Sequence, residues 1–174
     1  MDWNSLINGF RQYISLEKGL SNHTRLAYVS DLRKLEWYFN EQELKLSPID
    51  LKPQNVIDFI IYLNSLGIGE RSQARMLSSI RAFFKYLLIE DLIQVEPTEL
   101  IQGPKLPITY PEVLSVEEVE KFLSVIDLSD PHGHRNRAMF ETLYACGLRV
   151  SEMITLKLAG YFPDIGFVRK KKKN

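Results

Sequence analysis

The chain has 174 residues, of which 45% are hydrophobic, and its 22 basic residues balance 22 acidic ones. This suits one ordinary domain or two small ones, and the single cysteine excludes a disulfide framework and a cysteine-built zinc site. The N-terminus lacks a signal-peptide pattern, and the longest apolar run, FIIYL at 59–63, is far shorter than the ~20 residues that cross a bilayer. We therefore expect a cytoplasmic protein without a membrane span, a metal or a cofactor.

Two amphipathic helices are expected first. Apolar residues recur at helical spacing between Trp3 and Ile14, and Gly19 follows the run as a C-terminal cap. Ser21 suits the N-cap of a second helix that ends near Asn40. Its apolar stripe consists of Tyr28, Leu32, Leu35 and Phe39.

Two further helices and a connector follow. Pro53 opens a third helix, which Gly67 and Gly69 close, and a fourth helix is expected over about 71–88. The next stretch, LIQGPKLPITYPEVL, has too many prolines for a helix and suits a stiff, extended connector. We place a first domain at 1–100, a linker at 101–111 and a second domain at 112–174.

The second domain also begins helical. Ser115 and Glu118 form an S-x-x-E capping box, and another helix is expected from about Arg135 to Cys146, with Gly147 as its cap. Beyond it, 161–162 and 167–169 read as two short extended pieces around a turn. A hairpin that starts here cannot complete a sheet, so the second domain is expected to be incomplete.

The fourth helix divides into an apolar and a basic face. The apolar arc contains Met76, Leu77, Ile80, Phe83, Phe84, Leu87 and Leu88. The opposite arc has four cations among small side chains and no acid: Arg71, Arg75, Ser78, Arg81, Ala82 and Lys85. A solvated face usually mixes signs to gain i,i+4 pairs, so this one-signed face favours an anionic partner, such as a phosphate backbone, over plain solvation.

The start of the second helix gives a weaker signal of the same kind. SNHTRLAY places Ser21, His23, Thr24 and Arg25 at a helix N-terminus, where backbone N–H groups and the helix dipole favour phosphate. Ser21 also has a purely structural interpretation as a cap, and Tyr28 lies on the core stripe. We count Thr24, Arg25 and Tyr28 as candidate DNA-binding residues beside Arg71, Arg75, Ser78, Arg81 and Lys85.

Arg149 is the most unusual residue of the second domain. It lies in ACGLRVSEMITLKL among Leu148, Val150, Met153 and Ile154, so we expect its guanidinium to be half buried. A buried charge without a partner is costly, so either an internal carboxylate or an anionic ligand is expected to meet it.

Several of these motifs together resemble bacterial tyrosine recombinases of the Xer and phage-integrase type. LSNHTRLAYVSDLRKLEWYF is similar to the family's first-domain signature, and RMLSSIRAFFKYL to its fourth-helix signature. RNRAMFETLYACGLRVSEMITLKL is similar to the first arginine box. The resemblance implies a mainly α fold: a four-helix SAM-like core-binding domain, then a partial, mostly helical start of the catalytic domain with the beginning of a β-hairpin.

The resemblance also implies roles for individual residues. Arg149 matches the arginine that binds the scissile phosphate, and Glu152 would hold it in place. Lys173 matches, in ungapped register, the hairpin lysine that acts as general acid, although the usual flanking glycines are absent and a stray basic tail is equally open. None of the eight tyrosines matches the nucleophile motif. We expect this chain to bind DNA without cutting it.

Two functional hypotheses stay open at this point. In the first, the chain is the N-terminal part of a nucleoid-associated bacterial recombinase, shortened before its nucleophile, whose partners are a dif-like or attachment-site duplex and a second recombinase subunit. In the second, it is a helical interaction module whose basic helix face binds an acidic protein.

Overall fold

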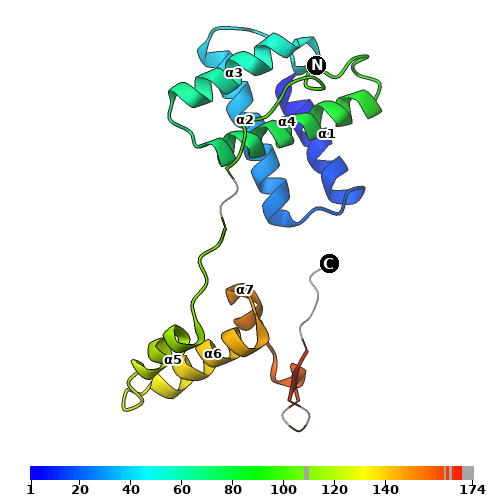
Figure 1. Cartoon of the computed structure of the whole chain (residues 1–174). Coiled ribbons are helices and arrows are strands. Elements are labelled where there is room, and N and C mark those ends of the chain that lie inside the picture. Colours follow the sequence, from blue (N-terminus) through cyan, green and yellow to red (C-terminus); the bar gives the residue numbers. More distant parts are fainter. Residues whose placement is uncertain (108–109, 163, 165, 170–174) are drawn as a thin grey trace. The chain divides into compact units, whose positions relative to one another are not determined.

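The computed structural model describes residues 1–107, 110–162, 164 and 166–169. The chain forms two compact units, residues 1–108 and 109–174 (Figure 1). The mainly α fold expected from the sequence is confirmed. Within the described residues, no helix is long and apolar enough to span a membrane.

Four α-helices build the first unit, as Figure 1 illustrates. They are α1 (Trp3–Leu16), α2 (Asn22–Glu41), α3 (Pro53–Ser65) and α4 (Glu70–Ile89), and a short 3-10 turn, η1 (Pro48–Asp50), precedes α3. The expected helices are all present, and α4 exceeds its expected range by one residue at each end. Ser21 caps α2 as expected, because its hydroxyl accepts the N–H of Thr24 at 3.2 Å. The first helix stops before the expected cap, with Glu17 at its C-cap and Gly19 at φ 56° in the turn beyond.

Aromatic side chains from three helices form the centre of the first unit. Phe10 of α1 meets Phe83 of α4 edge-on, with ring centroids 5.5 Å apart, and Tyr86 at 5.8 Å. Tyr28 of α2 stacks on the same Phe10 ring. The expected apolar arc of α4 is buried except Leu88, which is 38% exposed because it lies at the rim of that arc.

The segment that follows α4 is attached to it before the chain leaves the first unit. Thr98 is fully buried, Ile101 packs against the core, and the guanidinium of Arg81 donates to the Ile101 carbonyl. The first residues of the expected linker therefore lie on the α4 surface.

The second unit contains three helices and a hairpin. They are α5 (Val116–Ser124), α6 (Gly133–Cys146) and α7 (Val150–Met153), followed by the 3-10 turn η2 (Leu158–Gly160) and the strands β1 (Tyr161–Phe162) and β2 (Phe167–Val168). The strands pair antiparallel, with Tyr161 opposite Val168 and Phe162 opposite Phe167. The expected capping box is present: Ser115 Oγ accepts the Glu118 N–H at 3.2 Å, and Glu118 Oε2 accepts the Ser115 N–H at 2.8 Å.

Apolar side chains of the second unit are largely open to solvent. Among its described hydrophobic residues, Val119 alone is buried. Phe122 of α5 and Phe140 of α6 meet edge-on at 5.0 Å, yet they remain 50% and 41% exposed. The helices of this unit therefore pack locally, without a closed core.

Candidate nucleic-acid interface

The basic face of α4 lies on the surface of the first unit. Arg71, Arg75, Ser78 and Lys85 are exposed, and Arg81 is half-buried. The opposite side of the helix lies in the core, so the helix presents its cations to solvent because its apolar arc is used for packing. Within the described part of the chain, no hydrogen bond or ion pair involves the Lys85 ammonium.

Arg75 has an internal anionic partner that comes from another helix. Its Nη1 donates to Oδ2 of Asp31 on α2, and the Asp31 side chain is 0% exposed whereas that of Arg75 is 44% exposed. Ser79 Oγ donates to the same Oδ2 at 2.8 Å. The sequence analysis counted only the acids of the fourth helix itself, whereas the carboxylate that pairs with Arg75 comes from α2 and is a neighbour in space.

Arg81 and Ser78 are also engaged within the first unit. The Arg81 guanidinium donates to the carbonyl of Ile101, and Ser78 Oγ donates to the Ala74 carbonyl at 2.9 Å within the helix. Arg81 is thus tied to the segment that leaves α4. Lys85, near the C-terminal end of this face, makes no contact of this kind within the described residues.

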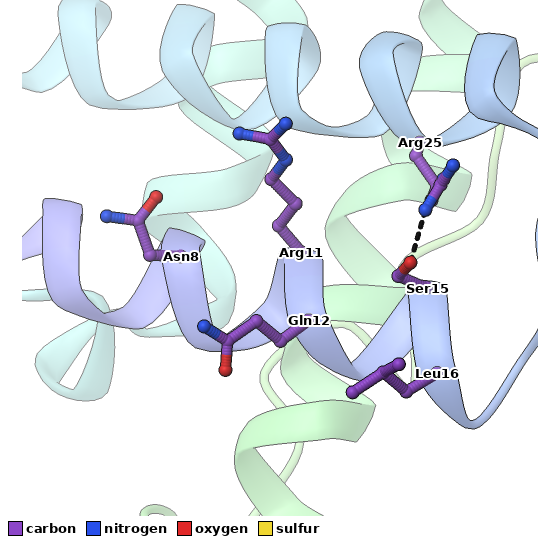
Figure 2. A pocket seen from close by; sticks show the side chains of 6 residues that line it. All are labelled: Asn8, Arg11, Gln12, Ser15, Leu16 and Arg25. Atoms are coloured by element: carbon purple, nitrogen blue, oxygen red, sulfur yellow. Dashed lines mark hydrogen bonds between the residues drawn. The ribbon is translucent and has the colours of Figure 1, made fainter.

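The guanidinium of Arg25 contacts side chains of α1 and α2. Its Nη1 donates to Ser15 Oγ of α1 (Figure 2). Its Nη2 lies 3.5 Å from Asn22 Oδ1. Its Nε–H is shielded from solvent and has no hydrogen-bond acceptor within the described residues. Arg25 lines a shallow groove of about 610 Å³ between α1 and α2, together with Asn8, Arg11, Gln12, Ser15 and Leu16.

The other two candidates on α2 have structural contacts. Thr24 is half-buried, and its hydroxyl lies 2.9 Å from Ser21 Oγ in the N-terminal cap. The Tyr28 ring stacks on Phe10 at a centroid distance of 6.4 Å and an interplanar angle of 6°. Cap formation and core packing therefore account for part of what the sequence pattern suggested as phosphate binding.

Arg149 lies at the N-cap of α7 and is paired with Glu152. The Arg149 N–H donates to Glu152 Oε2 at 2.9 Å, and Nη1 donates to Oε1 at 3.2 Å. The side chain is 78% exposed, so the expected half-buried guanidinium is wrong. The reason is that Val150 and Ile154, whose apolar character suggested burial, are themselves exposed. The two residues expected to act together are nevertheless in contact.

Three further observations concern the candidate residues. Lys173 lies outside the described residues. Asp31 and Ser79 were not among the candidates, although one signal pointed to Asp31: a carboxylate directly before Leu32 on the apolar stripe of α2 requires a buried partner. No group of three His, Cys, Asp or Glu side chains in the described residues could hold a metal ion.

Comparisons with known proteins identify the family. Residues 7–91 match the N-terminal SAM-like domain of phage integrases, and residues 112–173 match the phage integrase family. The chain is 37% identical over 166 residues to tyrosine recombinase XerD of Listeria innocua, covering 95% of this chain and 56% of that protein. It is 41% identical over 153 residues to XerD of Pseudomonas putida, covering 88% of this chain and 51% of that protein. The chain belongs to the phage integrase family of tyrosine recombinases.

The comparison with solved structures supports the fold. The Tn1549 transposon integrase, solved in complex with circular intermediate DNA, matches with a TM-score of 0.62 at 19% identity, over 90% of this chain and 50% of that one. At this identity the likeness concerns the fold. The chain spans about half the length of the curated relatives it matches.

Proposed function

We propose that this chain is the DNA-binding portion of a Xer or integrase-type site-specific recombinase, and that it binds duplex DNA through the basic face of α4. The observation that carries the proposal is the exposed series Arg71, Arg75 and Lys85 along one face of a helix whose other face is buried. The membership in the tyrosine recombinases and the DNA complex of the structural neighbour support it.

The chemistry of this face suits a phosphate backbone. Arginine offers a planar fork of N–H donors that matches phosphate oxygens, and lysine offers a compact charge. Ser78 and Ala82 lie between the cations and are small, so a large partner could approach the helix closely. Contacts of this kind position a protein on DNA and release counterions, which makes binding strongly dependent on salt.

In the second unit, we assign Arg149 to the scissile phosphate and Glu152 to its orientation. The support is the match to the first arginine box and the double contact of Glu152 with the N–H and the guanidinium of Arg149. An arginine held in advance stabilises the charge that develops on phosphate oxygens in the transition state. By the same match, Lys173 would be the general acid.

Strand cleavage by this chain alone is not expected, because none of its eight tyrosines matches the nucleophile of the family. Covalent capture on a nicked suicide duplex would contradict this expectation. In the family reaction, the natural partners would be a dif-like or attachment-site duplex and a second recombinase subunit, on nucleoid DNA.

A salt titration with fluorescent short duplexes tests the DNA binding. We expect binding at ~50 mM salt, and we expect Lys85→Ala to lower the slope of log affinity against log salt by about one. Lys45→Ala removes the same charge from an exposed position in the loop after α2 and is the matched control, with a smaller expected change. No binding of the full chain to any duplex at this salt concentration would refute the proposal.

The same titration, repeated with polyglutamate, distinguishes DNA binding from the alternative hypothesis of an acidic protein partner. If the basic face binds an acidic polypeptide in place of DNA, polyglutamate will bind with a slope that Lys85→Ala lowers, whereas duplexes will not bind. Duplex binding that is lowered by Lys85→Ala and that polyglutamate competes only weakly supports the DNA proposal.

A further inference from the structure

A buried polar link between α2 and α4 involves the candidate DNA-binding residue Arg75. Asp31 is completely buried, and its Oδ2 receives both Nη1 of Arg75 and the hydroxyl of Ser79. These contacts join residues 44 and 48 positions apart in the sequence. Asp31 Oδ1 is also buried and has no hydrogen-bond partner within the described residues.

In the part of the chain that the structure describes, the Arg75 guanidinium is bound through only one of its nitrogens. Asp31 engages Nη1, while no contact within the described residues engages Nη2 or Nε of Arg75. The Arg75 side chain is 44% exposed, so part of it reaches the surface on the basic face of α4. Because the guanidinium is planar and rigid, a carboxylate that binds one nitrogen also fixes the direction in which the other donors point.

We propose that Asp31 is a positioning residue for DNA binding, which holds the Arg75 guanidinium so that its remaining N–H groups meet a backbone phosphate. This inference rests on the proposed DNA binding through α4. Ser79 helps to fix the Asp31 carboxylate, because its hydroxyl donates to the same carboxylate oxygen. A flexible arginine would lose side-chain freedom when it bound a phosphate, whereas an arginine fixed in advance loses less.

A simple charge argument predicts the opposite effect. Asp31 is an anion next to a surface that is expected to bind a polyanion, so its removal should strengthen DNA binding if only net charge matters. Positioning predicts weaker binding on the same change. The two explanations therefore differ in sign, which makes Asp31 informative.

The experiment compares Asp31→Asn with Asp58→Asn in the full chain. Both changes remove one negative charge, but Asp58 lies on α3, where it accepts from Gln54 at 2.8 Å. With duplex DNA at fixed salt, we expect Asp31→Asn to weaken binding about tenfold, the order of one charge-assisted hydrogen bond. We expect Asp58→Asn to bind as tightly as the unchanged chain or slightly more tightly. Equal or tighter binding by Asp31→Asn would overturn the inference.

A double-mutant cycle separates positioning from a general loss of structure. In the Arg75→Ala background, Asp31→Asn should change duplex affinity by less than about twofold, because the residue it positions is gone. A similar loss in both backgrounds would mean that Asp31 acts through the fold and would overturn the inference. Thermal unfolding followed by circular dichroism shows whether each variant is still folded at the temperature of the binding assay.

Arg75→Lys keeps the test decisive if Asp31→Asn does not fold. Lysine retains the charge and can pair with Asp31, but it lacks the fork that would serve carboxylate and phosphate together. We expect about as large a loss of affinity as for Arg75→Ala, and full affinity would overturn the inference. If the unchanged chain does not bind duplex DNA, the proposed function is refuted. Failure of the proposed function is therefore distinguishable from failure of the positioning role of Asp31.

Discussion

The two units of this chain differ in how their helices are held. In the first unit, α1, α2 and α4 share an aromatic core around Phe10 and Phe83, and the Asp31–Arg75 pair joins α2 to α4. In the second unit, the described contacts are local: a capping box at Ser115, an edge-on aromatic pair between α5 and α6, and a two-stranded hairpin. The comparison shows that capping and turn signals define secondary structure even where little apolar surface is buried.

The largest expected difference between the units concerns their aromatic residues. Phe83→Ala removes a fully buried ring that contacts Phe10, Phe84 and Tyr86, so it should lower the free energy of unfolding of the first unit by about 3–5 kcal/mol. Phe122→Ala, in the second unit, removes a ring that is half exposed and should leave that transition unchanged. Urea unfolding followed by circular dichroism measures both, and an equal loss for the two variants would contradict the contrast.

Two glycines, Gly9 in the first unit and Gly133 in the second, test whether a local clash destabilises a whole unit or only its neighbourhood. A Cβ at Gly133 would collide with the Asp127 carbonyl and lie 2.9 Å from Leu128 Cα, so Gly133→Ala must shift the backbone between α5 and α6. A Cβ at Gly9 would collide with the Tyr86 hydroxyl. We expect each change to cost about 1–3 kcal/mol. Hydrogen exchange should rise across the whole first unit in Gly9→Ala, but only over about 116–146 in Gly133→Ala.

Loss of an N-cap should matter more where tertiary support is weak. Ser21 and Ser115 each accept the N–H of the residue three positions on, at 3.2 Å in both helices. Replacement of either by alanine should cost about 1 kcal/mol in its helix. In Ser115→Ala, amide exchange should increase along all of α5, whereas in Ser21→Ala it should increase in the first turn of α2 alone. If amide exchange increased along the whole helix in both variants, packing of the first unit would not limit fraying of α2.

The smallest effect concerns the turn after α5. The hydroxyl and the N–H of Ser129 donate to Asp127 Oδ1, at 2.7 and 2.8 Å, and they lower the pKa of Asp127 below its ordinary value of 3.8. Because the folded pKa is the lower one, this stabilisation is present above pH 3.8 and is lost as the pH falls through the folded value. An NMR titration of the Asp127 carboxyl should give a lowered pKa, which Ser129→Ala should return toward 3.8.

The sequence predicted helices well and side-chain environments less well. Apolar periodicity and caps placed α1 to α4 and the Ser115 box, because these signals act between residues a few positions apart. The pairing of Arg75 with Asp31 could not be predicted from the fourth helix, since the partner lies on another helix. The burial of Arg149 was misjudged because apolar neighbours in sequence indicate burial only where another element covers them, and in the described residues none covers Val150 or Ile154.

The unequal exposure of the Asp31–Arg75 pair has a consequence for how this sequence can diverge. Loss of Arg75 leaves a carboxylate sealed in the interior without its cation, which is strongly destabilising, whereas loss of Asp31 leaves a cation that can turn toward water. Stability therefore constrains the order of substitution: loss of the acid first and the arginine afterwards avoids an unpaired buried carboxylate, whereas the reverse order passes through a less stable intermediate. Descendants that lack Arg75 should accordingly also lack Asp31.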